Sequence, residues 1–221
     1  MLVGNEVLRF YTRRAALYDA FIVRFLTYGA GMRALLARAV ELEPGRRILD
    51  AGCGTGLLTR SMWSVARERG IDGIRFHAFD LTPAMLNRFR AWIAATGADA
   101  IELREADVLV PRMLPEGWVD FDQIVSSAML EYVPRAELVS ALGNLRARLR
   151  PGGTILVAIT RRNLLMKILI EWGWGSTAYS RDEIAAAVAA AGFDEIRFLR
   201  PPFPHVAIAL WGLVIEARNP P

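Results

Sequence analysis

A glycine-rich turn constrains the fold of this chain more than any other feature. The heptapeptide Asp50-Ala51-Gly52-Cys53-Gly54-Thr55-Gly56 closes a predicted buried strand over 46–52 and leads into residues 57–69, where apolar side chains recur at helical spacing. Glycines permit a tight turn and let a ligand approach the backbone where a Cβ would collide. Amides at the start of the following helix favour a negative group. The pattern therefore predicts a strand–turn–helix unit with a ligand at the turn.

Strand and helix signals go on alternating along the rest of the chain. We expect strands over 74–80, 101–108, 121–127 and 154–160, and helices over 83–95, 134–149 and 181–191. Thr82 and Ser180 are expected N-caps, and Pro151-Gly152-Gly153 is expected to end the helix that begins at Pro134. Alternation of this kind indicates a parallel sheet covered by helices on both faces. The last expected strands, 195–200 and 206–217, are joined by too short a turn for a crossover helix and should pair antiparallel.

Length, charge and cysteine content limit the class of protein to which this chain can belong. The 221 residues suit a single domain, which we divide into a helical lid at 1–42, a core at 46–160, an apolar insert at 161–177 and a C-terminal helix with two strands at 178–221. The net charge of +4 comes from scattered arginines, which disfavours a nucleic-acid partner. A single cysteine, no signal-peptide pattern and no apolar run of membrane-spanning length favour a cytoplasmic protein.

The glycine spacing separates two kinds of cofactor. A dinucleotide-binding turn has the form G-x-G-x-x-G/A, whereas Gly52, Gly54 and Gly56 follow G-x-G-x-G with Leu57 next. No cluster of His, Cys or Asp has metal-ligand spacing, so no metal is expected. The spacing disfavours a nicotinamide-dependent oxidoreductase, which stays the less favoured enzyme alternative.

Several segments together resemble the class I S-adenosylmethionine-dependent methyltransferases. They are residues 48–56, 79–86, 105–108, 121–134 and 149–153, and the small-molecule branch with its quinone-biosynthesis C-methyltransferases is the most similar. The resemblance implies an α/β fold with a Rossmann-like seven-stranded, mostly parallel sheet, an antiparallel final strand and an N-terminal helical lid. It implies S-adenosyl-L-methionine as the cofactor, held by Asp50, Gly52, Cys53, Gly54, Gly56, Asp80, Leu81, Asp107, Val108, Ser127 and Tyr18.

The resemblance also implies separate tasks for the polar residues. Asp80 would accept hydrogen bonds from the ribose hydroxyls, Asp107 from the adenine amino group, and Asp50 would help hold the methionine ammonium. Ordinary structural alternatives exist: Asp80 as a helix-flanking charge next to the Thr82 cap, Asp107 as a carboxylate at a strand end, and Ser127 as a locally satisfied hydroxyl.

Candidates for catalysis are few. Methyl transfer is an in-line displacement that needs alignment, with a general base only for an acceptor that must lose a proton. Glu131 and Tyr132 follow the strand at 121–127, where the family places groups facing the acceptor; a carboxylate at a helix start is the alternative for Glu131. His77 is expected to be a buried structural residue and His205 to be exposed in the last turn.

Apolar segments indicate the acceptor class. Tyr11 in the lid, and Trp172 and Trp174 in the insert, are candidate acceptor contacts, although both segments could equally be ordinary core. The insert also has nearby cations, so peripheral membrane contact is a further expectation. The sequence thus predicts methyl transfer to a small, hydrophobic acceptor of quinone, lipid or natural-product type, with a non-catalytic cofactor-binding domain as the alternative. It leaves the oligomeric state open.

Overall fold

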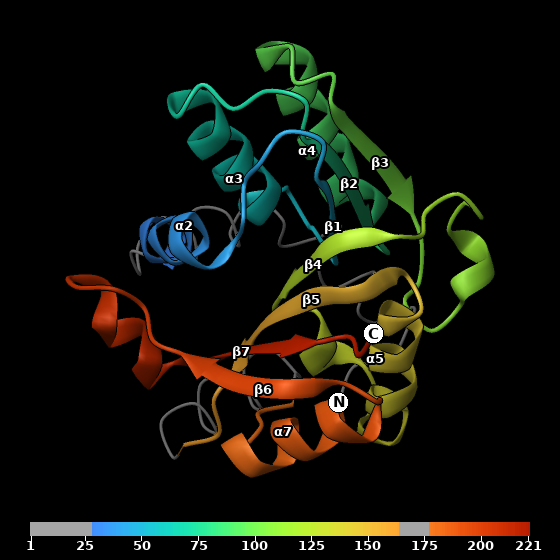
Figure 1. The fold of residues 1–221 in the computed structure, drawn as a ribbon, viewed down its shortest axis with the longest axis vertical. Coiled ribbons are helices and arrows are strands. Elements are labelled where there is room, and N and C mark those ends of the chain that lie inside the picture. Colours follow the sequence, from blue (N-terminus) through green and yellow to red (C-terminus); the bar gives the residue numbers. More distant parts are fainter. Residues whose placement is uncertain (1–27, 164–176) are drawn as a thin grey trace.

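Seven strands form one mixed sheet in the computed structural model, which describes residues 28–163 and 177–221 (Figure 1). The order is β3-β2-β1-β4-β5-β7-β6, with every neighbouring pair from β3 to β5 parallel and β7 antiparallel to both of its neighbours. The strands are β1 (Arg47–Ala51), β2 (Arg75–Asp80), β3 (Ile101–Glu105), β4 (Phe121–Ser127), β5 (Leu149–Thr160), β6 (Asp194–Leu199) and β7 (Gly212–Arg218). The predicted fold class is confirmed.

Helices cover both faces of this sheet (Figure 1). Alternate residues of each strand serve the two cores: Ile48 packs with α2 (Tyr28–Ala39), α3 (Leu57–Glu68) and α4 (Pro83–Thr96), while Leu49 packs with α5 (Leu138–Arg146) and α7 (Arg181–Ala190). Central strands buried on both faces are typical of a parallel sheet and account for much of the 53% hydrophobic composition. The described residues contain no helix that is both long and apolar enough to cross a membrane.

Two expected caps have different outcomes. Ser180 caps α7 with a full capping box, because its side chain accepts a hydrogen bond from Glu183 N and the Glu183 carboxylate accepts one from Ser180 N. Thr82 stands at the N-cap of α4, but its side chain makes no cap bond there. The carboxylate of Asp80 instead accepts a hydrogen bond from Thr82 N, at 2.8 Å.

The structure corrects three predicted boundaries. Pro151-Gly152-Gly153 does not separate a helix from a strand but lies inside β5, because Leu149 already pairs with Phe121. The expected strand 206–217 begins only at Gly212, and residues His205–Leu210 form the 3-10 helix η6. Short 3-10 turns over Leu130–Tyr132 and Arg135–Glu137 also precede α5, which is shorter than predicted. Most of the proposed lid at 1–42 and of the insert at 161–177 lies outside the described residues.

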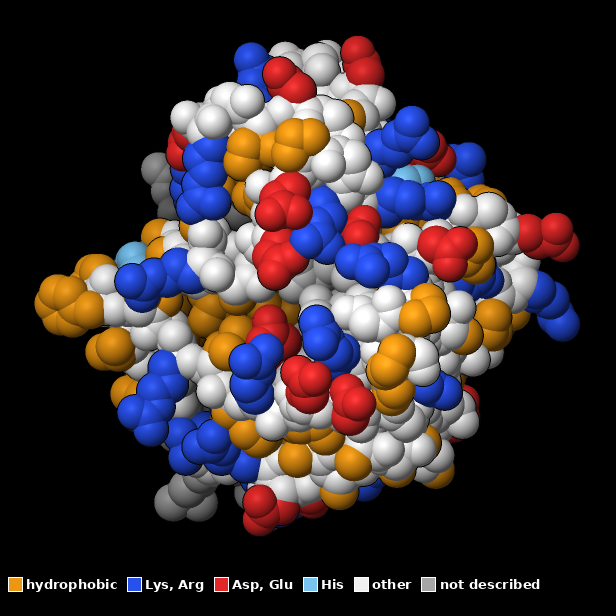
Figure 2. All heavy atoms as spheres, in the orientation of Figure 1, with side chains coloured by type: hydrophobic (Ala, Val, Ile, Leu, Met, Phe, Trp, Pro, Cys, Tyr) orange, Lys and Arg blue, Asp and Glu red, His pale blue; other side chains and the backbone are white. Residues whose placement is uncertain are grey.

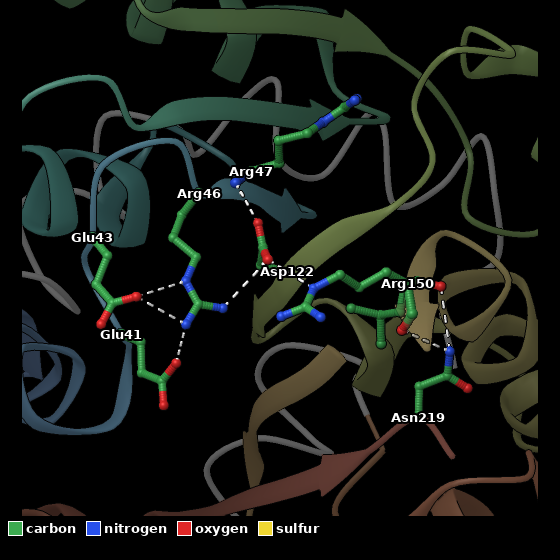
Figure 3. A network of polar contacts seen from close by, with 8 residues as sticks. Glu41, Glu43, Arg46, Arg47, Asp122, Arg150 and Asn219 are labelled. Carbon is green, nitrogen blue, oxygen red and sulfur yellow. Dashed lines mark hydrogen bonds and ion pairs between the residues drawn. The ribbon is translucent and has the colours of Figure 1, made fainter. Parts of the chain in front are cut away.

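An ionic network joins the amino ends of the central strands (Figure 3). Asp122 accepts hydrogen bonds from Arg47 N at 2.8 Å, Arg46 Nη1 at 3.3 Å and Arg150 Nε at 2.7 Å. Burial raises the pKa of Asp122, but these hydrogen bonds and charges outweigh burial and hold the pKa below its usual value. The network therefore ties β1, β4 and β5 together at the edge opposite their carboxyl ends.

Candidate functional site

A cavity of about 260 Å³ opens at the carboxyl ends of the parallel strands. The turns after β1, β2, β3 and β4 contribute its walls, as expected where strand order reverses in an open α/β sheet. The lining is largely apolar. Its predicted members are Asp50, Gly52, Cys53, Gly54, Asp80, Leu81, Asp107, Val108, Ser127 and Tyr132. Gly56 and Glu131 do not line it, and Tyr11, Tyr18, Trp172 and Trp174 lie outside the described residues.

The glycine turn is held by backbone bonds and by close packing. Gly52 N and Cys53 N both donate to Phe79 O at 2.9 Å, which fixes the turn to the end of β2. Gly52 has a φ of +71°, and a Cβ there would lie 2.3 Å from Met129 Cβ. Gly56 has a φ of +88°, and a Cβ there would lie 2.4 Å from the Phe89 ring. Glycine at 52 thus admits the loop after β4, while glycine at 56 lets α3 pack on α4.

Asp80 is the best placed of the predicted binding residues. One carboxylate oxygen accepts from Gly54 N and the other from Thr82 N, both at 2.8 Å. The Thr82 side chain and the Leu81 backbone are further hydrogen-bond partners of this carboxylate, which also lines the cavity. Burial raises the pKa of Asp80, against the lowering effect of these hydrogen bonds. The turn after β1 is therefore preorganised by the same side chain that faces the ligand space.

Asp50 carries a second buried carboxylate at the base of the turn. It accepts hydrogen bonds from Thr59 N at 3.1 Å and from Thr59 Oγ1 at 2.7 Å. Burial raises its pKa from 3.8 to about 7, with the nearby Asp80 charge adding to the rise. A cation entering the cavity would favour the ionised form, so Asp50 suits an ammonium group.

The ends of β3 and β4 supply the remaining polar groups. Asp107 accepts from Leu109 N at 2.9 Å, a local turn bond that leaves its second oxygen available to the cavity. Ser126, which follows the buried pattern of β4, donates to Ala51 O at 2.9 Å and has a structural role. Ser127 instead lines the cavity.

Glu131 holds the segment that follows β4 against the end of β5. Its carboxylate accepts from Thr160 N at 2.8 Å and from Thr160 Oγ1 at 3.1 Å, and its backbone oxygen accepts from Thr177 N at 2.8 Å. Burial raises its pKa to about 7. Because the side chain does not reach the cavity lining, the structure gives Glu131 no contact with an acceptor there. Its neighbour Tyr132 does line the cavity.

The two histidines lie away from the cavity lining. His77 is buried between the rings of Trp118 and Phe121, as expected of a structural residue, and burial lowers its pKa. His205, expected to be exposed, is half-buried at the start of η6.

Sequence reasoning missed Tyr28, the first residue of α2. Its hydroxyl lies 2.8 Å from Ser127 Oγ, across 99 positions of sequence, and both residues line the cavity. Burial raises the pKa of Tyr28 to about 12, so the phenol is neutral at physiological pH. The predicted aromatic residues of the N-terminal segment, Tyr11 and Tyr18, lie outside the described residues, and the contact that selects Tyr28 is tertiary.

The Tyr28–Ser127 hydrogen bond should be measurable by a double-mutant cycle. Tyr28→Phe and Ser127→Ala should each lower the free energy of unfolding by about 1 kcal/mol, and the double variant by little more than either alone. Urea denaturation at pH 7 of the four proteins gives the coupling energy. Additive losses would show that the two hydroxyls do not interact.

Comparison with known proteins identifies the domain. A family model described as a methyltransferase domain matches residues 48–153, the region that contains the cavity walls. The malonyl-[acyl-carrier protein] O-methyltransferase of Serratia marcescens is 34% identical over 162 residues, covering 73% of this chain and 55% of that protein. Residues 48–153 thus match a methyltransferase domain, and the described residues have the class I methyltransferase fold.

Further similar proteins are also methyltransferases by name. The ubiquinone biosynthesis O-methyltransferase of Burkholderia thailandensis is 29% identical over 163 residues, 72% of this chain and 60% of that protein. The chain thus spans less than two thirds of the length of these curated relatives. Magnesium protoporphyrin IX methyltransferase from Synechocystis PCC 6803, solved with bound S-adenosylhomocysteine, shares the fold with a TM-score of 0.65 at 17% identity, covering 89% of this chain and 84% of that one.

The charge of the cavity fits the cofactor of the methyltransferase family. Its acidic lining residues are Asp50, Asp80, Asp107 and Glu137, and no Arg, Lys or His is among the lining residues that the structure describes. S-adenosylmethionine carries a sulfonium and an ammonium, whereas a dinucleotide brings a pyrophosphate. Opposite charges attract and like charges repel in a partly buried site, so this lining favours the methyl donor and disfavours a nicotinamide cofactor.

Proposed function

We propose that this protein transfers a methyl group from S-adenosylmethionine to a small, hydrophobic acceptor. The observation that carries the proposal is an acidic cavity lining on the glycine turn, with apolar walls and with no Arg, Lys or His among its described residues. A relative named for ubiquinone biosynthesis supports an apolar acceptor, and the O-methyltransferase names of that relative and of the malonyl-[acyl-carrier protein] enzyme support an oxygen nucleophile.

Each binding task falls to a residue whose position is known. Asp80 would accept hydrogen bonds from the ribose hydroxyls, Asp107 from the adenine amino group, and Asp50 from the ammonium. Gly54 leaves open space, since nothing lies within 4 Å of a Cβ built there, so the ligand can lie close to the backbone. When bound, S-adenosylmethionine supplies a methyl group already activated on sulfur.

The protein then has to align the acceptor and keep water out. Tyr28 and Ser127 close one part of the cavity through their shared hydrogen bond, and Tyr132 and Val133 line it beyond the end of β4. Glu131 is a positioning residue in this scheme, because it ties the segment containing Tyr132 to Thr160. Holding two reactants in line is the main contribution an enzyme can make to such a displacement.

Titration of the purified protein with S-adenosylmethionine and S-adenosylhomocysteine in a calorimeter tests the binding half of the proposal. Saturable binding of both is expected, and absence of binding by folded protein would overturn it. Transfer is tested with radiolabelled methyl donor and an organic-solvent extract of lysate as the acceptor pool. Label recovered in the organic phase is expected. Binding without any transfer would instead support the non-catalytic alternative.

A further inference from the structure

An apolar ridge projects from the fold beside the candidate site. It comprises residues 203–210, which join β6 to β7 and include the 3-10 helix η6. Phe203 is 87% exposed, Leu210 63% and Val206 54%, which are the three highest exposures among the large hydrophobic residues of the described chain. Figure 2 shows hydrophobic side chains gathered at this projecting margin, with basic side chains beside them. A cluster of this kind on a surface marks a site of interaction.

The base of the ridge is firmly held. Ile208 is buried against Gly31 of α2, where an added Cβ would lie 2.0 Å from Ile208 Cδ1. Arg161 donates to Ala209 O at 3.1 Å, and Asn163 donates to Leu210 O at 2.7 Å. The carbonyls of Ala209 and Leu210 are therefore hydrogen-bonded by another segment, and the exposed side chains stand on a fixed support.

The ridge is surrounded by positive charge. The described segments around it, 28–40, 161–163 and 196–215, contain no Asp or Glu, and their arginines are Arg33, Arg38, Arg161, Arg162, Arg197 and Arg200. Arg33, Arg162 and Arg197 are ion-paired with glutamates of other segments. Among the residues that the structure places, Arg38, Arg161 and Arg200 have no acidic partner.

We infer that the 203–210 ridge docks on the surface of an anionic phospholipid bilayer. Phe203, Val206 and Leu210 would enter the boundary between headgroups and acyl chains, while Arg200 and its neighbours meet the negative headgroups. A second copy of the chain fits less well, because two ridges meeting face to face would bring these arginines together without carboxylates to pair them. Three side chains on a narrow projection also offer far less than the roughly 800 Å² that each partner buries in a stable dimer.

The ridge lies next to the cavity through α2. Gly31 packs against η6, and Tyr28, one helical turn earlier on the same face, lines the cavity. Docking would therefore bring the cavity close to the bilayer, where an apolar acceptor dissolves. Only this last step depends on the proposed function; docking itself does not require methyl transfer.

Co-sedimentation of the full chain with vesicles tests the inference. Vesicles of phosphatidylcholine with a quarter phosphatidylglycerol should bind the protein more tightly than pure phosphatidylcholine. The variant carrying Phe203→Ser and Leu210→Ser should lose about ten-fold in partition for each side chain removed. Arg200→Gln should lose about five-fold on the anionic vesicles and little on neutral ones. Met113→Ser, at a residue 43% exposed on another surface, is the matched control and should bind as the unchanged protein does.

Three results would overturn the docking inference. They are no binding of the unchanged protein, equal binding by the double variant, and a dimer in analytical ultracentrifugation that the double variant dissociates. Thermal unfolding of the double variant should match that of the unchanged protein, and a large drop in its midpoint would mean that the ridge is covered by the chain itself. Calorimetric binding of S-adenosylmethionine, measured on the same variants, reports separately on the proposed function.

Discussion

Replacing Asp80 with alanine should weaken S-adenosylmethionine binding about a hundred-fold or more. The carboxylate accepts from Gly54 N and Thr82 N and lines the cavity, where we propose that it also binds the ribose hydroxyls. Hydrogen bonds to a charged group are worth about 1.5–3 kcal/mol each, so losing two of them accounts for a loss of that size. Disordering of the glycine turn adds to it, since Gly54 N would lose its partner. Isothermal titration calorimetry at pH 8 measures the change.

A matched control for Asp80 lies on the neighbouring strand. Glu105 is in register with Asp80 in the β2–β3 pair, but it is exposed and does not line the cavity. Glu105→Ala should therefore bind the cofactor as the unchanged protein does. Asp80→Asn is a milder second variant than alanine, because its amide keeps one oxygen that can accept from the two backbone donors. If folded Asp80→Ala binds within three-fold of the unchanged protein, Asp80 has no role in holding the ribose.

The fold could be predicted from the sequence where a buried apolar run is bounded by clear turn signals. The strand over Phe121–Ser127 has its predicted limits, because it is buried on both faces and bounded by turns. The predicted strand over 206–217 starts too early, because hydrophobicity alone does not say which side chains are buried. Three prolines in Pro201-Pro202-Phe203-Pro204 remove backbone donors from the region before it, so the first part of the run leaves the sheet. Exposure of Phe203 is thus visible only in three dimensions.

Some residues of the candidate site could also be predicted from the sequence, and others could not. The glycine turn and the carboxylates at strand ends could be predicted because strand order and local motif together bring them to one edge. Tyr28 could not, because its place depends on how α2 packs beside the end of β4. Glu131 was expected to face the acceptor from its position after a strand, yet its carboxylate is used by Thr160. Position along the chain identifies an edge of the sheet but not the direction of a side chain.

Glu131 makes the stability of the protein depend on pH. Its pKa rises from 4.5 to about 7 on folding because burial disfavours the charged carboxylate. Below pH 4.5 the group is protonated in both states and has no effect. Between pH 4.5 and 7 the unfolded chain loses this proton while the folded protein keeps it, so the free energy of unfolding falls as pH rises. Above pH 7 the loss levels off at up to about 3 kcal/mol.

Glu131→Gln should therefore stabilise the protein at pH 8 by up to about 3 kcal/mol and change it little at pH 5. The amide oxygen can still accept from Thr160 N, and its NH₂ can donate to Thr160 Oγ1, so both contacts survive without the cost of a buried charge. Urea denaturation at the two pH values measures the difference. Glu116→Gln, at an exposed carboxylate, should show no such dependence. A gain of equal size at pH 5 and pH 8, or a loss at both, would contradict the explanation, because only ionisation separates the two conditions. Asp50, whose pKa also rises to about 7, will leave part of the pH dependence in place.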